Sequence, residues 1–340
     1  MIFVRIHAMP CVNRCWHCFC CGSPDDPSME GATVLRILDE LAALKRESGE
    51  TVFPLFYDEP TVHPDFVRIM GRQLDLGLIM DDWWFPTNGY GLARLPDEGW
   101  SELAEKGFEG IRLHFHGVGE RHDRRVGRRG AYDDLVETIR RAEQFSVEWL
   151  AGMVLSADNA AEYDETKSEV EKLGSPCVKF GWMLPQSQGR ADGTGNRVRL
   201  QHIAHLLRAN GGWKTEADHI RAILSDETLG GRKALDPDCG TMWLDISHDL
   251  TVTFGGGCDG DPYDGMKSLV TLGNLESGSI LECYRRYLEN PPAPVRKLSA
   301  VTWGELAGRY GDPGSDFVYH ITDLTGRMWA SRYLRDAFPE

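Results

Sequence analysis

The sequence lacks the features of a membrane-spanning or exported protein. It has no run of about 18 apolar residues, and no basic segment followed by an apolar signal core stands at its beginning. Its nine cysteines are an odd number, and five of them lie between positions 11 and 21, unlike the disulfide framework of a secreted domain. These absences favour a reducing compartment, so we expect a cytoplasmic protein with no membrane partner.

Positive charge is also scarce. The 340 residues include 37 Lys and Arg against 52 Asp and Glu, which gives a net charge of −15. Nucleic acids and anionic membranes bind basic surfaces, so we expect neither as the main partner. The acidity permits a cationic small substrate, although solubility alone explains it equally well. With 41% hydrophobic and 26% charged residues, the composition is that of a globular protein.

What the sequence does contain is a dense cysteine motif near its beginning. Cys11, Cys15 and Cys18 follow a short strand predicted at 1–4 and are separated by three and then two residues. Thiolates select zinc, copper(I) or iron–sulfur clusters, and all-sulfur sites normally take four cysteines. A cluster held by three cysteines would leave one iron open to a small molecule.

At this motif the chain resembles the radical S-adenosylmethionine (radical SAM) superfamily, whose signature is CxxxCxxC after the first barrel strand. The resemblance implies a [4Fe-4S] cluster held by Cys11, Cys15 and Cys18. In that family the open iron chelates the amino and carboxylate groups of SAM. One electron, from an external reductant of the flavodoxin or ferredoxin type, then cleaves SAM to methionine and a 5'-deoxyadenosyl radical. The radical takes a hydrogen atom from the substrate.

Two further motifs carry the resemblance. The run Tyr57-Asp58-Glu59-Pro60 is similar to the family's Gly-Gly-Glu-Pro, and Thr87-Asn88-Gly89 matches its third-strand ending. The resemblance implies that Tyr57, Asp58, Glu59 and Asn88 help to hold SAM. Tyr57 and Asp58 replace the usual glycines, which would let a ligand approach closely. Either the backbone there still reaches SAM, or an acidic side chain accepts from its ammonium group.

Histidines mark the remaining candidate positions. His17 stands just before the third cysteine, where the family places an aromatic residue, and is expected near the adenine. The strand predicted at 110–115 and the polar run after it resemble the family's fourth strand and the loop that follows. His114 and His116 occupy its usual Ser and Asp positions. His114 is expected to help hold SAM, and His116 and Asp123 to meet the substrate; for His116 a satisfied, buried strand histidine is the alternative.

The spacing of strands and helices predicts an α/β fold. Six strand–helix units imply parallel connections, and with the resemblance they imply an open, partial (βα)6 TIM barrel over 1–195, with its active site at the C-terminal strand ends. The strands are expected at 1–4, 51–56, 83–85, 110–115, 149–155 and 178–184.

For the rest of the chain, the sequence pattern predicts a helical linker at 196–235, a small α+β module at 236–295 and a helical tail at 296–340. Cys239, a hairpin, Cys258, a Leu-Gly-Asn run and a helix with Cys283 resemble the twitch or SPASM-type module of many radical SAM enzymes. Two interpretations stay open. Either Cys239 and Cys258, with Cys283 nearby, bind an auxiliary iron–sulfur cluster, or the module has lost it. Cys283 can also be a small buried hydrophobe or a hydrogen-atom donor to a substrate radical.

Three functions follow from these patterns. We favour a radical SAM enzyme acting on a small polar natural product of the aminoglycoside, sugar or nucleoside type, by epimerisation, dehydrogenation or rearrangement. Only ten residues precede Cys11, which leaves no room for an N-terminal peptide-recognition domain. The second hypothesis is modification of a peptide or protein. The third is an iron–sulfur or zinc protein without catalysis, such as a zinc knuckle with Cys20 or Cys21 as its fourth ligand.

Overall fold

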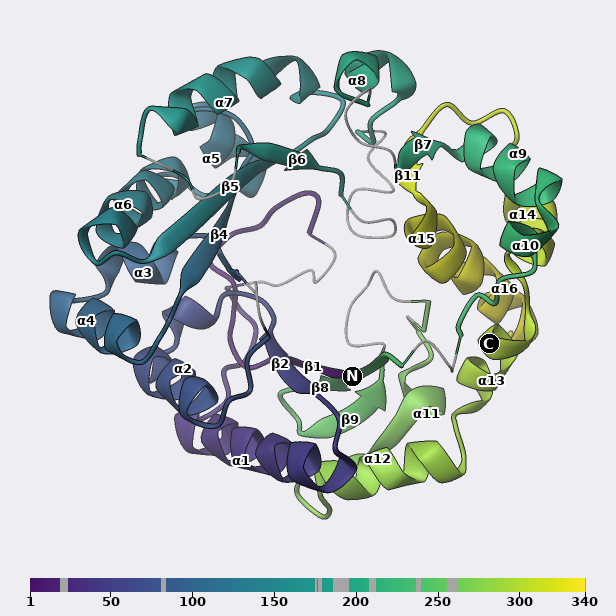
Figure 1. The fold of residues 1–340 in the computed structure, drawn as a ribbon, viewed down its shortest axis with the longest axis horizontal. Coiled ribbons are helices and arrows are strands. Elements are labelled where there is room, and N and C mark those ends of the chain that lie inside the picture. The colour runs from purple at the N-terminus through teal and green to yellow at the C-terminus, as the bar shows by residue number, and fades with distance from the viewer. Residues whose placement is uncertain are drawn as a thin grey trace.

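A partial ring of strands, lined outside by helices, forms the larger part of the molecule (Figure 1). The computed structural model describes residues 1–18, 24–80, 84–174, 176, 179–185, 196–207, 212–236, 240–255, 262–263 and 265–339. Among these residues, no helix is long and apolar enough to cross a membrane.

The N-terminal half alternates strands and helices, as predicted. The six strands are β1 (Ile2–Ile6), β2 (Val52–Phe56), β3 (Phe85–Thr87), β4 (Gly110–Phe115), β5 (Glu148–Val154) and β6 (Gly181–Met183). The helices are α1 (Gly31–Ser48), η1 (Pro60–Val62), α2 (Phe66–Asp75), α3 (Tyr90–Arg94), α4 (Asp97–Glu105), α5 (Glu120–Val126), α6 (Ala131–Gln144), η2 (Ala160–Glu162) and α7 (Tyr163–Glu171).

The strands pair in parallel within two sheets. One sheet has the order β3-β4-β5-β6, and in the other β1 lies between β2 and β8 (Met242–Ile246), parallel to both. Parallel strands buried on both faces are near-continuous apolar runs. β2 follows this pattern, and β1 departs from it at Arg5, whereas β4 alternates, with Arg112 and His114 between buried apolar residues. The strand predicted at 83–85 begins at Phe85 instead and extends to Thr87, in register with β4.

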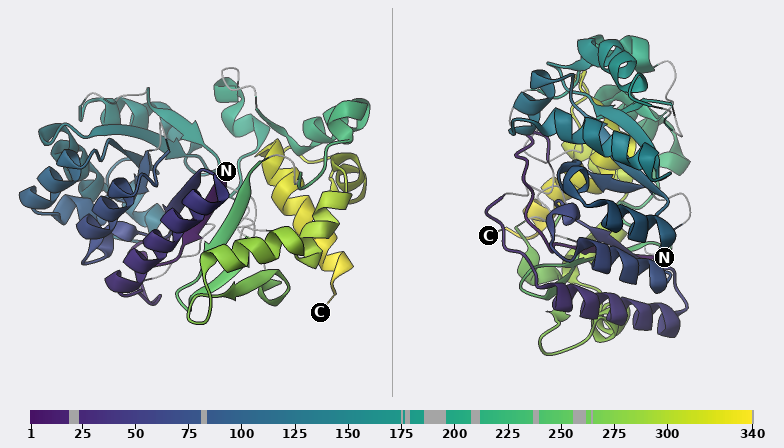
Figure 2. Two further views of the ribbon diagram at one scale, coloured as in Figure 1. Left: turned by 60° about the horizontal axis from the view of Figure 1, so that its bottom comes forward. Right: turned by 90° about the vertical axis from the view of Figure 1, so that its left-hand side faces the viewer.

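Helix α1 illustrates how the outer layer packs. Its buried residues recur at helical spacing and include Val34, Ile37, Leu41 and Leu44, so that one apolar stripe faces the sheet. The helix ends at Gly49, whose φ of 71° lies in the left-handed region that glycine adopts without strain. On its other side α1 packs against α12 (Ile280–Glu289), from the C-terminal part of the chain (Figure 2).

The C-terminal half continues the sheet and then occupies the open side of the ring. β8 is followed by antiparallel β9 (Thr251–Phe254) and β10 (Thr271–Asn274), so the sheet runs β10-β9-β8-β1-β2 across the predicted module boundary. The boundaries at 195, 235 and 295 themselves stay predictions. The other elements are α8 (Leu200–Leu207), β7 (Trp213–Thr215), α9 (Glu216–Ser225), α10 (Glu227–Gly230), α11 (Lys267–Val270), α13 (Ala293–Ala300), α14 (Trp303–Tyr310), β11 (Val318–His320), α15 (Ile321–Asp323), the π-helix η4 (Leu324–Met328) and α16 (Trp329–Ala337).

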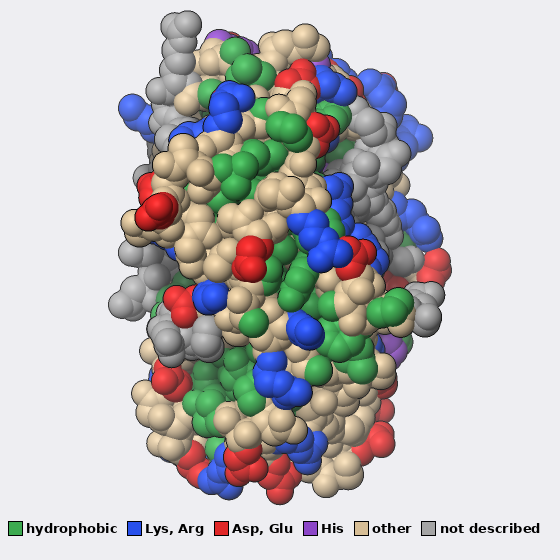
Figure 3. All heavy atoms as spheres, turned by 90° about the vertical axis from the view of Figure 1, so that its right-hand side faces the viewer, with side chains coloured by type: hydrophobic (Ala, Val, Ile, Leu, Met, Phe, Trp, Pro, Cys, Tyr) green, Lys and Arg blue, Asp and Glu red, His purple; other side chains and the backbone are tan. Residues whose placement is uncertain are grey.

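A helical group on the right of Figure 1 includes α9, α14 and α16, which pack on one another. The outward face on this side carries acidic and basic side chains interspersed among apolar ones (Figure 3). Inside the group Trp329 is fully buried, and its indole N–H donates to Glu216 Oε1 at 3.1 Å. The buried side chains of this group belong to the same hydrophobic core as those of the sheet.

Candidate active site

The cysteine loop lies between β1 and α1 at the C-terminal end of β1. Cys11, Cys15 and Cys18 are partly exposed and line a single cavity of about 260 Å³. Two backbone hydrogen bonds fix the loop: Cys18 N–H donates to Cys15 O at 3.2 Å, and Arg14 N–H donates to Val126 O at 2.8 Å. The second bond attaches the cysteine loop to the end of α5.

The other walls of this cavity come from the ends of three neighbouring strands. Every predicted cofactor-binding residue lines it, together with His116. Because the carboxyl ends of parallel strands meet at one edge of a sheet, positions far apart in sequence converge there. The strand-end residues are Tyr57, Asp58 and Glu59 after β2, Thr87 and Asn88 at β3, and His114 and His116 at β4, and His17 comes from the cysteine loop.

Glu59 holds two of these strand ends together. Its buried carboxylate accepts hydrogen bonds from Thr61 Oγ1 at 2.5 Å, Thr87 Oγ1 at 2.8 Å and Asn88 N–H at 2.6 Å. Each hydroxyl also accepts a backbone N–H, from Gly91 and Gly89 respectively. The hydroxyl protons are therefore directed at Glu59, which acts as an acceptor. Burial raises the pKa of Glu59, and these hydrogen bonds oppose the rise.

Asn88 extends from this network to the first cysteine. Its side-chain Nδ2 donates to Cys11 Sγ at 3.6 Å, and its Oδ1 accepts from Tyr90 N–H at 2.9 Å. Both ends of the amide are thereby fixed, so the orientation of Asn88 is determined by partners on either side. Burial, and next the charge of Glu59, raise the pKa of Cys11 to about 12.

Asp58 is one of the two residues that replace the family's usual glycines, and its backbone conformation bears on how this position can contact a ligand. Its φ of 69° is in the left-handed region, which glycine adopts at little cost and Asp tolerates better than most residues. The backbone at Asp58 therefore has a conformation that a glycine at this position would adopt without strain. The carboxylate lies 3.6 Å from His7 Nδ1 and still lines the cavity.

Four histidines gather on the β4 side of the cavity. The rings of His17 and His116 lie 4.3 Å apart, and those of His116 and His122 lie 5.5 Å apart. Burial lowers the pKa of His17 to about 3 and those of His114 and His122 to about 4, and it lowers the pKa of His116 well below its usual value. All four imidazoles are therefore neutral near pH 7. His17 Nδ1 and His116 Nδ1 are buried without a hydrogen-bond partner in the structure, so both can hydrogen-bond a ligand.

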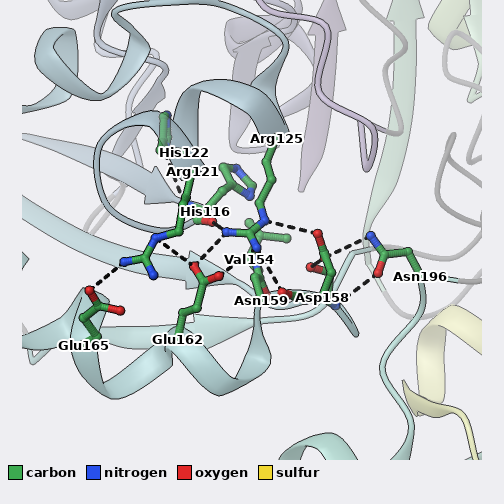
Figure 4. A network of polar contacts seen from close by, with 11 residues as sticks. His116, Arg121, His122, Arg125, Val154, Asp158, Asn159, Glu162, Glu165 and Asn196 are labelled. Atoms are coloured by element: carbon green, nitrogen blue, oxygen red, sulfur yellow. Dashed lines mark hydrogen bonds and ion pairs between the residues drawn. The ribbon is translucent and has the colours of Figure 1, made fainter.

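His116 is held through its backbone by two side chains of α5. His116 N–H donates to His122 Nδ1 at 3.1 Å, and Arg125 Nη1 donates to His116 O at 2.7 Å. Arg125 also binds both oxygens of Glu162, at 2.8 and 2.9 Å, and the carboxylate of Asp158 (Figure 4). This arginine network joins the loops after β4 and β5 and supports His116 from behind.

Two further candidate residues, Asp123 and Cys283, do not line the cysteine cavity. Asp123 accepts from Gly130 N–H at 2.6 Å and Tyr132 N–H at 2.9 Å, so it supports the start of α6 and does not line the cysteine cavity. Cys283 is buried on α12, close against Gly273 of β10, and it does not line this cavity. Cys20, Cys21, Cys239 and Cys258 lie outside the described residues.

Sequence reasoning missed the residues that support the site. Arg125, Glu162 and Asp158 form the network behind His116, and Arg128 Nε donates to Asn13 Oδ1 of the cysteine loop at 2.7 Å. The available signal was the density of arginines at 121–129 in an acidic chain. It could not identify their partners, because Glu162 and Asp158 lie on a different strand–helix unit.

The donors present fit an iron–sulfur cluster. Three thiols from one loop face one cavity, and thiolate is the ligand that such clusters take. Among the described residues, no three His, Cys, Asp or Glu side chains meet closely enough to share one metal ion. In a cluster each cysteine binds a different iron, so such close convergence is not required.

Comparison with known proteins supports the same chemistry. Residues 6–170 match the radical SAM superfamily. This radical SAM region contains the cysteine loop, every predicted cofactor-binding residue and the arginine network. No curated protein matches the chain.

Solved structures of radical SAM enzymes share the fold. The structure of anSMEcpe with bound AdoMet (SAM) and Cp18Cys peptide has a TM-score of 0.56 at 13% identity, covering 99% of this chain and 97% of that one. The structure of Streptococcus suis SuiB bound to the precursor peptide SuiA has a TM-score of 0.54 at 14% identity, covering 83% of this chain and 64% of that one. These likenesses confirm the partial TIM barrel.

Proposed function

We propose that this chain is a radical SAM enzyme whose cysteine loop holds a [4Fe-4S] cluster and whose strand ends hold SAM. The observation that supports the proposal most strongly is that Cys11, Cys15 and Cys18 line one cavity together with Glu59, Asn88 and the histidines. When bound, the cluster and SAM would supply a 5'-deoxyadenosyl radical able to take a hydrogen atom from an unactivated carbon.

The chain's own residues would bind and orient these groups. Glu59 fixes the ends of β2 and β3 so that the backbone at Asp58 can reach the amino end of SAM. Asn88 holds Cys11 through its amide. His17 and His114 line the same cavity and would contact SAM, as the resemblance implies, and apolar Phe56, Val126 and Leu135 in its lining would exclude water.

For the substrate, we propose a small polar molecule. The peptide alternative draws support from the similar structures, since anSMEcpe and SuiB are both recorded with peptides. Tight binding of a leader peptide by this chain would favour that alternative. The electron would come from a flavodoxin- or ferredoxin-type protein.

We propose that 236–295 is a twitch or SPASM-like module. The observed order of β8, β9, β10 and α12 agrees with the hairpin, the Leu-Gly-Asn run and the helix of that pattern. An auxiliary cluster at Cys239 and Cys258 would make the total iron content about eight per chain rather than about four.

The proposal is tested by replacing Cys15 with alanine in anaerobically purified protein. The variant should lose the brown cluster absorbance and the formation of 5'-deoxyadenosine from SAM and dithionite. Cys283→Ala removes a buried thiol that does not line the cavity, and this variant should retain both. Formation of 5'-deoxyadenosine by the Cys15→Ala variant at the wild-type rate would refute the assignment.

A further inference from the structure

The inner face of β4 carries a charged residue that the proposed function does not use. Ile111, Leu113 and Phe115 are fully buried in the hydrophobic core. Arg112 and His114 alternate with them, so both lie on the opposite face of the strand, toward the inside of the ring (Figure 1). His114 lines the cysteine cavity. Arg112 comes two residues earlier, about 7 Å deeper along the strand.

Two neighbours connect Arg112 to the cysteine cavity. In the parallel pairing of β3 with β4, Arg112 lies opposite Pro86, which lines that cavity. On its own strand, Arg112 lies close enough to His114 to affect its titration, since burial and next the charge of Arg112 lower the pKa of His114 to about 4. Arg112 therefore lies beside the lining of the cysteine cavity, on its deeper side.

Arg112 has no partner of its own among the described residues. None of them forms a hydrogen bond or an ion pair with its guanidinium, including the exposed Glu109 and Glu148 at the start of β4 and β5. Burial lowers the pKa of Arg112. For Arg125 burial acts in the same direction, yet its carboxylate partners, Glu162 among them, raise the pKa overall. A carboxylate beside Arg112 would have the same effect.

A partly buried charge without a partner is costly. The guanidinium of Arg112 loses part of its hydration and gains no ion pair in return. A carboxylate or phosphate group that entered the barrel would supply the missing partner, because guanidinium binds such groups through two parallel hydrogen bonds. The chain thus presents a donor for an anion at the deep side of its cysteine cavity.

The inner face also has room beside this arginine. In the sheet, Gly152 of β5 lies opposite His114, and Gly181 of β6 lies opposite Gly152. A Cβ added at Gly181 would meet no atom of the described residues within 4 Å. Farther along β4, the buried His116 Nδ1 has no hydrogen-bond partner in the described part of the chain. A small molecule that extends from Arg112 to His116 would therefore meet a charge, open space and a polar atom.

We propose that Arg112 binds the substrate through a carboxylate or phosphate group, with the rest of the molecule directed past His114 toward His116 and the proposed SAM site. This inference rests on the proposed function and specifies its substrate class, a small molecule with an anionic group. A wholly neutral or cationic substrate does not fit it.

The test is chemical modification of anaerobically purified, full-length protein with 2,3-butanedione, which reacts with guanidinium groups. Mass spectrometry of the digested protein gives the rate at Arg112. We expect inorganic phosphate or acetate to slow this rate at least fivefold relative to neutral acetamide, at matched ionic strength. SAM alone should leave the rate within twofold. Arg335, exposed on α16, should react equally fast in every sample. The anion that protects more strongly identifies the preferred group.

Variants separate binding from a structural role. Arg112→Gln should weaken binding of the protecting anion at least tenfold in a calorimetric titration, because the charge-assisted hydrogen bonds are lost. Its melting temperature should equal or exceed that of the wild type, since the variant removes a charge that has no partner in the chain. Arg112→Lys should keep a preference for the anion over acetamide. Arg335→Gln should bind the anion as the wild type does.

Four results would overturn the inference. The first is no reaction of Arg112 with butanedione, a reagent as small as the expected ligands. The second is equal protection by the anions and acetamide. The third is protection by SAM as strong as by the anions, which would make Arg112 a SAM ligand. The fourth is wild-type anion binding by Arg112→Gln.

Failure of the proposed function is distinguishable from failure of this inference. It would appear as absent iron or absent 5'-deoxyadenosine in the wild type, whatever the rate of modification at Arg112.

Discussion

Glu59 shows how one side chain can organise a site without carrying out its chemistry. Its carboxylate is almost fully buried, and its three hydrogen-bond donors come from η1 and from the end of β3. The sequence motif identified Glu59 as a cofactor residue. The structure shows that the carboxylate oxygens accept hydrogen bonds from the chain itself. In the proposed function, Glu59 would therefore contribute to SAM binding by positioning the neighbouring backbone.

Removing this carboxylate should destabilise the protein. Glu59→Ala leaves three donors without their acceptor, and we expect a loss of about 2–4 kcal/mol in the free energy of unfolding. Urea unfolding followed by circular dichroism measures it. Glu289→Ala, at an exposed glutamate on α12, should change the free energy by less than about 0.5 kcal/mol. A change of that small size in Glu59→Ala would contradict the role assigned to the network.

At the scale of elements, helix α5 links the cysteine loop to the rest of the barrel. Its end accepts the backbone N–H of Arg14, its Arg125 binds Glu162 and Asp158, and its His122 holds His116. Figure 4 shows the contacts of Arg125 and His122, whose partners come from separate loops. The position of His116 therefore depends on α5 and on the loop after β5.

Replacing Arg125 should loosen this region. Arg125→Met removes the two closest contacts of the largely buried Glu162 and leaves it the longer ion pair with Arg121, at 3.6 Å, so we expect a loss of about 2–4 kcal/mol. Amide hydrogen exchange should become faster in the cysteine loop and at 120–130. Arg121→Met is the matched control, since Arg121 is on the same helix and its closest ion pair is with the exposed Glu165, at 2.6 Å; its loss should be below about 1 kcal/mol. Unchanged exchange in Arg125→Met would mean that α5 does not support the loop.

The elements also show what sequence could and could not predict. The apolar runs and the CxxxCxxC, Glu-Pro and Thr-Asn-Gly motifs were sufficient for the α/β class, for the partial barrel and for the residues that converge on the cysteine cavity. Local patterns did not predict that β8 lies beside β1, because strand order depends on contacts between distant segments. For the same reason the Arg5–Asp245 pair could not be predicted from the sequence.

For the whole molecule, the buried histidines make stability depend on pH. The pKa of His122 is lowered by burial to about 4, whereas in the unfolded chain it is about 6.5. Between these values the unfolded chain binds a proton that the folded chain does not. Stability therefore falls as pH decreases from about 6.5 to about 4, and the contribution of His122 between pH 7 and pH 5 is about 2 kcal/mol.

His122→Asn tests this contribution, because the Asn side-chain oxygen can accept the His116 N–H but does not titrate. The decrease in the free energy of unfolding between pH 7 and pH 5 should be smaller in this variant by about 2 kcal/mol. His205→Asn, at an exposed histidine on α8, should retain the wild-type pH dependence. If both variants lose stability with acid as the wild type does, His122 is not neutral in the folded protein.

The measurement that tests the account most directly is iron and sulfide content per chain under anaerobic conditions, with 5'-deoxyadenosine assayed on the same samples. Wild type should be compared with the variant in which Cys11, Cys15 and Cys18 are all alanine. We predict that the variant loses about four irons and all formation of 5'-deoxyadenosine. If the iron content falls from about eight to about four per chain, the protein has a second cluster. If it falls from about four to none, the protein has a single cluster. Iron content unchanged by the triple replacement, or zinc in its place, would contradict the central claim.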